Sequence, residues 1–177
     1  MLDVIVIGAG QAGLATAYAL RSAGLSFEML EAAAEPGGAW SNYYDSLKLF
    51  SPARYSSLPG MQFPGDPARY PARDEVVEYL RTYARHFSFP VVCNVRVKAV
   101  EAIEGGFQLM DEQDRRWLCR ALVVATGSFA QPHRPWFEGN ENFAGQVLHA
   151  ADYRKTSDVQ GRRIAVVGAG NSAVQIA

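Results

Sequence analysis

Two glycine-rich motifs carry the clearest chemical meaning in this sequence. Residues 8–13 (GAGQAG) have the G-x-G-x-x-G spacing, and residues 168–173 (GAGNSA) repeat it with alanine in the third slot. The first glycine allows a tight turn, the second lets a pyrophosphate approach the backbone, and the third lets helix and strand pack closely. The helix that follows offers N–H groups to the phosphates. The sequence therefore predicts two dinucleotide sites, and two dinucleotides on one chain imply electron transfer between them.

Glu31 extends the first motif. It comes directly after the apolar run 27–30, at the end of the next expected strand. A carboxylate at this point accepts hydrogen bonds from ribose hydroxyls. A glycine-rich turn with a surface glutamate is the simpler interpretation, and the strand before and the helix after the motif disfavour it. In the second motif, the residue that selects between a ribose hydroxyl and a 2′-phosphate is expected about twenty positions further on, beyond residue 177, which leaves NADPH and NADH open.

The elements that must position these motifs follow from the spacing of the apolar residues. Short apolar runs bounded by turn residues predict buried parallel strands, and helical spacing predicts helices. Alternating runs separated by turns predict an antiparallel meander. We expect strands over 2–7, 27–30, 121–125 and 163–167, helices over 11–23, 73–87 and from Asn171, and a meander built from 91–103, 107–110 and 116–118. The expected fold class is α/β, with a Rossmann-type domain of parallel sheet, helices and small meander, followed by the first strand and helix start of a second Rossmann unit.

Residues 32–72 show no clear periodicity and are rich in glycine, proline and interleaved aromatic residues. A segment of about forty residues is long for a structureless loop in a compact domain. We expect it to be functional or partly structured.

Composition excludes several classes of function. The chain has 177 residues, 20% of them charged, and a net charge of −1, so it carries no polycationic surface for nucleic acid. No apolar run approaches the roughly 18 residues of a membrane span, and no signal peptide is recognised. Cys93 and Cys119 form no C-x-x-C pair and the three histidines are scattered, so we expect no metal site and a reducing, cytoplasmic location.

With these motifs in place, the sequence resembles the class B flavoprotein monooxygenases, the flavin-containing and YUCCA-like enzymes of bacterial type and the Baeyer–Villiger enzymes among them. Residues 37–40 (GGAW) are similar to the family's G-G-x-W segment, and residues 125–127 (ATG) to the segment where the chain leaves the FAD domain. Residues 46–52 (SLKLFSP) followed by Tyr70-Pro71 are similar to bacterial and YUCCA-type members. The most specific likeness is Phe143-x-Gly145-x-x-x-His149-x-x-x-Tyr153, which matches the signature F-x-G-x-x-x-H-x-x-x-W/Y.

The resemblance implies a reaction and a domain plan. FAD would be reduced by NADPH or NADH and react with O2, and the C4a-(hydro)peroxyflavin would insert one oxygen atom into a small organic substrate. The expected parts are an FAD-binding domain (1–131), a connector with the family signature (132–160) and the start of an NAD(P)-binding domain (161–177). The expected partners are substrate and O2, and the plan allows a homodimer.

The resemblance also assigns residues. Trp40, Lys48 and Phe50 would lie near the flavin or the substrate, although Phe50 cannot hydrogen-bond through its side chain, as asparagine near this position does in some members. Core packing is the alternative for both aromatic residues, and a structural role in the connector is the alternative for His149. The expected FAD residues are Gly8, Gly10, Gln11, Ala12, Gly13, Glu31, Gly38, Trp40, Val97, Ala125, Thr126 and Gly127. The expected NAD(P) residues are Gly168, Gly170, Asn171, Ser172 and Ala173.

Two other functions remain open at this point. One is an FAD-binding fragment without turnover, because the family's remaining NAD(P)-domain and FAD-domain segments follow this region. We expect the intact parent to be active and the 177-residue chain alone to be inactive. The other is a thioredoxin-reductase-like oxidoreductase, which shares the two glycine motifs but needs the C-x-x-C pair that this sequence lacks.

Overall fold

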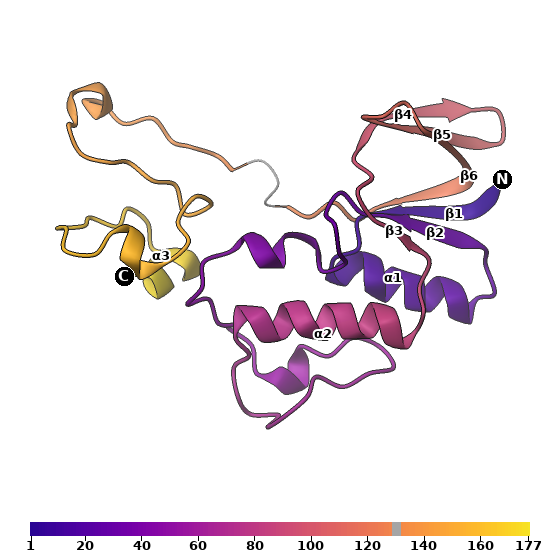
Figure 1. The fold of residues 1–177 in the computed structure, drawn as a ribbon, viewed down its shortest axis with the longest axis horizontal. Helices are drawn as coiled ribbons and strands as arrows, with labels where there is room; N and C mark the ends of the chain where they lie inside the picture. The colour runs from indigo at the N-terminus through magenta and orange to yellow at the C-terminus, as the bar shows by residue number, and fades with distance from the viewer. Residues whose placement is uncertain (129–131) are drawn as a thin grey trace.

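The computed structural model describes residues 1–128 and 132–177 (Figure 1). In chain order its helices and strands are β1 (Leu2–Ile7), α1 (Gln11–Ser22), β2 (Phe27–Leu30), α2 (Arg73–His86), β3 (Val91–Val92), β4 (Val97–Ile103), β5 (Gly106–Asp111), β6 (Arg116–Val124) and α3 (Asn171–Ile176). Short 3-10 turns η1 (Gly38–Asn42), η2 (Ala53–Tyr55), η3 (Asn140–Asn142) and η4 (Thr156–Asp158) lie in the connections. The expected α/β class with a mostly parallel sheet is confirmed.

A single six-stranded sheet organises the described part of the chain, in the order β3-β2-β1-β6-β5-β4. Strands β3, β2, β1 and β6 are parallel, and β6, β5 and β4 form the antiparallel meander. Because β6 belongs to both parts, the meander continues directly from the parallel sheet. Because β3, β2, β1 and β6 run in the same direction, their carboxyl ends lie at the same edge of the sheet.

The two faces of the sheet bury different cores. Val4 and Val6 of β1 face α1 and α2, whereas Ile5, between them, faces the side with Leu109 and Cys119. This alternation is the period of two that a pleated strand imposes on its side chains. Figure 1 shows α1 and α2 together on one side of the parallel strands, and the β4–β5 hairpin rising on the other. The cluster under the helices is the larger one and holds the α2 aromatic residues Tyr79 and Tyr83.

The long segment 32–72 is partly structured, as expected. It contains η1, η2 and two isolated bridges, Lys48 with Ala72 and Leu58 with Met61. Its turns are tied to α2 by buried hydroxyls. Tyr79 donates to the Met61 carbonyl at 2.7 Å, and Tyr83 donates to the Pro59 carbonyl at 2.6 Å. The segment is therefore a layer packed on α2.

Three expectations about strands are wrong. Val91–Val92 pairs in parallel with β2 and is not part of the meander. Residues 116–118 and 121–125 are not two strands but one, because β6 pairs with β5 at its beginning and with β1 over most of its length. Residues 163–167 form no strand within the described ranges, and Ile164, Val166 and Val167 are exposed. A parallel strand needs a hydrogen-bonding neighbour, and the described residues provide none there.

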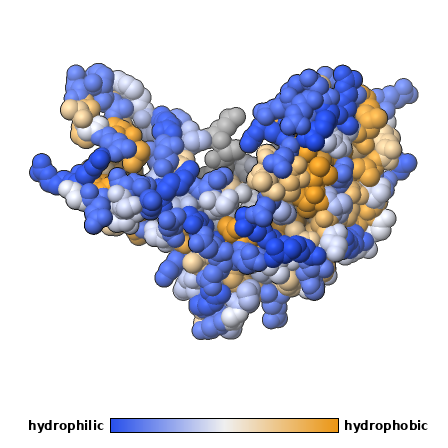
Figure 2. Space-filling model, viewed as in Figure 1, coloured by the Kyte–Doolittle hydropathy of each residue, from blue (hydrophilic) through white to orange (hydrophobic). Residues whose placement is uncertain are grey.

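After β6 no described residue rejoins the sheet. In Figure 1 residues 132–160 run away from the sheet, and α3 ends close to the early part of the 32–72 segment. Figure 2 shows the surface hollowed between the meander and the region around η3. The expected domain boundary after residue 131 falls at residues outside those described. No helix in the two described ranges has both the length and the apolar character to cross a membrane.

Candidate functional site

The carboxyl ends of the four parallel strands meet around Gly8. The Gly8 N–H donates to the Leu30 carbonyl of β2 at 2.8 Å, and the Ala125 N–H, just after β6, donates to the Ile7 carbonyl at 2.8 Å. The Val95 N–H, after β3, donates to the Glu31 carbonyl at 2.9 Å. In open α/β sheets ligands bind in the crevice outside these strand ends. The sheet thus gathers the expected FAD residues at one edge.

The glycines of the first motif are required by close backbone packing. Gly8 has φ +103°, and a Cβ atom there would collide with the Ala125 carbonyl oxygen. A Cβ atom at Gly13 would collide with the Gly8 carbonyl oxygen. The strand end, the helix start and residue 125 are therefore in backbone contact, as the fingerprint requires.

The helix α1 begins with free donors aimed out of this turn. The first helical acceptor is the Gly10 carbonyl, which accepts from the Leu14 N–H at 2.9 Å. The N–H groups of Gln11, Ala12 and Gly13 precede that bond and have no acceptor within the helix. Together with the positive end of the helix dipole they form a phosphate-binding end.

Glu31 is a buried carboxylate at the centre of the strand ends. Its Oε2 accepts from the Ala9 N–H at 2.7 Å, and its Oε1 accepts from the Ala33 N–H at 2.9 Å. The side chain thus fixes the glycine turn relative to the segment that follows β2. Each carboxylate oxygen has a further lone pair, so these bonds are compatible with acceptance from a ribose hydroxyl.

The G-G-x-W segment lies directly on the glycine turn. The Gly37 N–H donates to the Ala9 carbonyl at 2.9 Å. Gly38 has φ +60°, and a Cβ atom there would lie 2.9 Å from the Gly10 Cα. The Trp40 indole N–H donates to the Gln11 side-chain oxygen. The two glycine loops are therefore packed backbone against backbone beside the start of α1, and a side chain at Gly38 would separate them.

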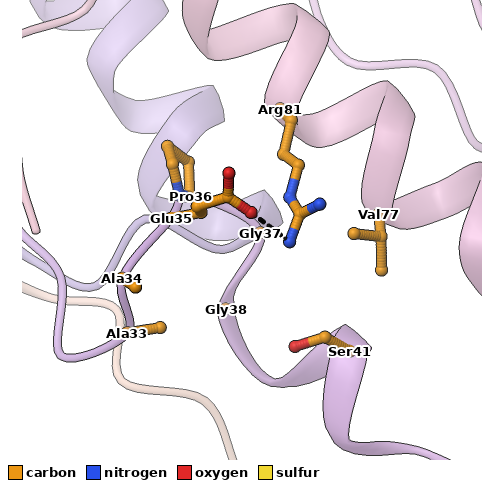
Figure 3. Close-up of a pocket in the computed structure, with 9 residues that line it drawn as sticks. All are labelled: Ala33, Ala34, Glu35, Pro36, Gly37, Gly38, Ser41, Val77 and Arg81. Atoms are coloured by element: carbon orange, nitrogen blue, oxygen red, sulfur yellow. Dashed lines mark ion pairs between the residues drawn. The ribbon is translucent and has the colours of Figure 1, made fainter.

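A cavity of about 180 Å³ borders the same segment. Figure 3 shows Arg81 reaching from α2 toward the loop 33–38, where it pairs with Glu35 at 2.6 Å. The Arg81 Nε is buried without a hydrogen-bond partner. A buried donor without a partner costs free energy, so Arg81 is held here by its ion pair with Glu35 and not by a full set of hydrogen bonds.

The remaining expected FAD residues lie at the edges of this site. Ala125 contacts the Gly8 turn, and Thr126 and Gly127, with φ +80° at the glycine, continue from it. Val97 begins β4, two residues after Val95, whose N–H binds the Glu31 carbonyl. These positions are consistent with the expectation, and the contacts to a cofactor stay a prediction.

The three expected catalytic residues have different surroundings. Trp40 packs partly against the core and reaches the first glycine motif. The Lys48 backbone is held by a bridge to Ala72 and by the side chain of Gln175. Phe50 exposes 75% of its surface, so core packing does not explain it. No measured contact joins the three among the described residues.

The second glycine motif is far less enclosed than the first. Helix α3 begins at Asn171, as expected. Gly168 has φ +131°, and a Cβ atom there would meet only the Ala173 methyl, at 3.7 Å. A Cβ atom at Gly170 would meet nothing within 4 Å. The motif adopts its turn, but among the described residues no sheet strand is packed against it.

The connector signature makes local and long-range contacts. The His149 Nδ1 accepts from the Ala151 N–H at 3.0 Å, which supports the structural alternative for this residue. Tyr153 is buried and lies against Tyr44, with ring centroids 6.0 Å apart. The Arg154 carbonyl accepts from the Asp45 N–H at 2.7 Å. The end of the signature is thereby attached to the 32–72 segment.

Neither cysteine is suited to thiol redox chemistry. Burial, together with the charges of Glu31 and Glu35, raises the pKa of Cys93 above its usual value. Burial also raises the pKa of Cys119. A thiol with a raised pKa is protonated near neutral pH, and the thiolate is the reactive form. Both cysteines are free.

Comparison with known families decides the relationship. The profile described as pyridine nucleotide-disulphide oxidoreductase matches residues 5–177. The chain belongs to this family. Individual relatives show which members of the family the chain resembles.

The most similar curated relatives include oxidoreductases and plant monooxygenases. An uncharacterized oxidoreductase CzcO-like from Geobacillus kaustophilus is 39% identical over the whole chain, which covers 51% of that protein. The probable indole-3-pyruvate monooxygenase YUCCA7 from Arabidopsis thaliana is 38% identical over 97% of the chain and 42% of its own length. The chain thus spans about half the length of these relatives. The resemblance to YUCCA-type monooxygenases is confirmed.

Solved structures lead to the same group. The flavin-containing monooxygenase from Stenotrophomonas maltophilia is 43% identical, with a TM-score of 0.93 over 99% of this chain and 53% of its own. Two monooxygenases that are 29% and 26% identical have NADP bound in their structures, and the second also holds FAD. The chain is therefore a relative of flavin monooxygenases with a Rossmann-type fold.

Two residues that matter in the structure are missed by sequence reasoning. Arg73 resembles a solvated first-turn residue of a helix, yet its guanidinium donates to the Tyr43 carbonyl and to Asp45, both at 2.6 Å. Gln175 resembles an ordinary polar residue after the second glycine motif, yet its side chain bonds to Lys48, 127 positions away. No local pattern signals either contact, because both partners lie in the aperiodic segment 32–72.

Proposed function

We propose that this chain forms the FAD-binding part and the beginning of the NAD(P)-binding part of a flavin-dependent monooxygenase. The single observation that carries the proposal is the tightly packed glycine turn 8–13 at the end of four parallel strands, with the first N–H groups of α1 beside it. FAD bound there, reduced by NADPH or NADH, would supply the oxygen chemistry. One atom of O2 enters a small organic substrate and the other leaves as water.

The residues divide the binding tasks between them. Gly8, Gly10, Gly13 and the first N–H groups of α1 bind the FAD pyrophosphate, and Glu31 accepts from the adenosine ribose. Gly38 and Trp40 bound the site on the side of the 32–72 segment. The remaining FAD contacts would come from the adjoining strand ends, through Val97, Ala125, Thr126 and Gly127.

The second glycine motif would bind the nicotinamide nucleotide. Gly168 and Gly170 provide the turn, and Asn171, Ser172 and Ala173 begin the helix. We place the FAD-binding domain at 1–131, the connector at 132–160 and the start of the NAD(P)-binding domain at 161–177. The chain's coverage of about half of its relatives fits this plan.

The aromatic segment is the proposed boundary of the reaction space. Trp40 would lie near the flavin, and Lys48 and Phe50 near the substrate. Exclusion of water protects oxygenated intermediates from wasteful decay, and the exposed Phe50 ring fits an apolar lining that closes over a substrate. Because Phe50 cannot donate a hydrogen bond, stabilisation of a bound oxygen would come from another group.

The test uses the purified full-length protein with NADPH or NADH, and an aryl methyl thioether as the probe substrate. We expect a yellow protein that binds FAD, consumes NAD(P)H and O2, and transfers one labelled atom from ¹⁸O2 to the probe as sulfoxide. The 177-residue chain alone should show little turnover. A colourless protein that fails to take up added FAD would overturn the proposal.

A further inference from the structure

Gln175 connects α3 to the 32–72 segment through both halves of its amide. Its Nε2 donates to the Lys48 carbonyl at 2.9 Å, and its Oε1 accepts from the Lys48 N–H at 3.3 Å. The Tyr44 hydroxyl also donates to Oε1, at 3.2 Å. The side chain therefore engages both backbone groups of Lys48, as a neighbouring strand would.

These hydrogen bonds join the region of the second glycine motif to the 32–72 segment, which packs on the first glycine motif. Across the described ranges, every hydrogen bond that joins residues 161–177 to residues 1–128 comes from the Gln175 side chain. Gln175 follows Gly170 by five positions, little more than one helical turn. Gln175 thus links the helix that follows the second glycine turn directly to the Lys48 backbone.

The partner of Gln175 is a segment held firmly from the opposite side. The Arg73 guanidinium bonds to the Tyr43 carbonyl and to Asp45, and the Arg73 N–H donates to the Leu47 carbonyl at 2.9 Å. Residues 43–48 are thereby attached to the beginning of α2, and Lys48 bridges to Ala72. The Lys48 backbone is therefore held from two sides, and loss of the Gln175 amide would leave it attached on the α2 side alone.

We infer that Gln175 is a positioning residue that couples nicotinamide-nucleotide binding at the second glycine turn to the placement of the Lys48–Phe50 segment beside the flavin. This inference rests on the proposed function. It predicts an effect on reduction by NAD(P)H and none on the binding of FAD, because the FAD residues lie at the strand ends and make no contact with Gln175 in the described part of the chain.

The test compares Gln175→Ala with Gln146→Ala in the full-length protein. Gln146 is an exposed glutamine whose side chain accepts from Arg162, so it controls for loss of a surface amide. We expect Gln175→Ala to bind FAD within about twofold of wild type and to lower kcat/KM for NAD(P)H by about fivefold to tenfold, in the range of typical coupling between sites. Single-turnover flavin reduction, followed by visible absorbance, should slow with it.

Tyr44→Phe separates coupling from general destabilisation. It removes the hydroxyl that bonds to Gln175 and keeps the ring that faces Tyr153. We expect Tyr44→Phe to slow reduction less than Gln175→Ala and to add nothing in the double variant, since both remove one interaction.

The outcomes distinguish the inference from the proposed function. If the wild-type protein is reduced by NAD(P)H and FAD-loaded Gln175→Ala keeps pace with Gln146→Ala, the inference fails and the proposed function stands. Loss of FAD from Gln175→Ala would also contradict it, because the role would then be structural. A wild-type protein that takes up no FAD overturns both.

Discussion

The two glycine motifs have nearly the same letters and very different surroundings. At residues 8–13 the turn is wedged between four strand ends, and both Gly8 and Gly13 lie against carbonyl oxygens. At residues 168–173 the turn has the same order of strand-like run, glycines and helix, but Gly170 faces open space. The third slot shows the difference most directly, because Gly13 has no room for a methyl group whereas Ala173 carries one. The motif specifies a local turn, and the neighbouring strand ends enclose that turn only in the first motif.

The largest effect should come from exchanging the third-slot residues. Gly13→Ala drives a Cβ atom into the Gly8 carbonyl, and we expect it to lower the free energy of unfolding by about 3 kcal/mol, at the upper end for overpacking. Ala173→Gly creates no clash and should cost about 1 kcal/mol, through helix propensity. Urea unfolding of the two variants measures the contrast. A smaller loss for Gly13→Ala than for Ala173→Gly would refute the distinction between the motifs.

A smaller change in the free energy of unfolding should appear at high pH, and its source is Tyr83 in the core on the α2 side of the sheet. Burial, with contributions from Tyr79 and Tyr18, raises the pKa of Tyr83 from 10.0 to about 12. The folded protein therefore favours the neutral phenol, so the stability from this group is complete below pH 10 and is lost as the pH rises toward about 12. Urea unfolding measured at a series of pH values across this window should show a steep fall in the free energy of unfolding.

Tyr83→Phe tests the source of that fall. It removes the titrating group and the bond to the Pro59 carbonyl, so stability should drop by about 1 kcal/mol at neutral pH and decline less steeply above pH 10. Tyr55→Phe, at a residue that is 72% exposed, should leave the curve unchanged. If the alkaline slope of Tyr83→Phe equals that of wild type, then Tyr83 does not set the alkaline limit.

The sequence predicts the first region better than the second because its signals are local. The bounds of β1 and β2 agree with the apolar runs, and α1 and α2 differ from the expected helices by one residue at their ends. The errors concern pairing. The apolar pattern predicts Val91–Val92 in the meander and two strands in place of β6, because alternation along a strand does not say which neighbour it will join.

The candidate site divides in the same way. Gly8, Gly13 and Glu31 were predictable because their roles depend on a turn and on the next strand. The contacts of Arg73 and Gln175 were not, since each depends on how the aperiodic segment 32–72 folds back on distant residues. The apolar run 163–167 predicts a strand by its composition, but a strand also requires a partner.

In the proposed function the first motif binds FAD and the second binds the nicotinamide nucleotide, and substitution of the middle glycine of each motif tests this assignment with little disturbance of the fold. Gly10 and Gly170 both have extended backbone with negative φ, and a Cβ atom meets only the Gly38 Cα at 3.6 Å in the first case and nothing in the second. Alanine at either position should therefore leave the fold intact and obstruct a phosphate.

The decisive measurement is the FAD dissociation constant and the KM for NAD(P)H of full-length Gly10→Ala and Gly170→Ala. We predict that Gly10→Ala weakens FAD binding at least about tenfold, equal to about 1.4 kcal/mol. Gly170→Ala should keep FAD within about twofold and raise the KM at least about tenfold. Equal loss of FAD from both variants, or wild-type FAD affinity in Gly10→Ala, would contradict the assignment.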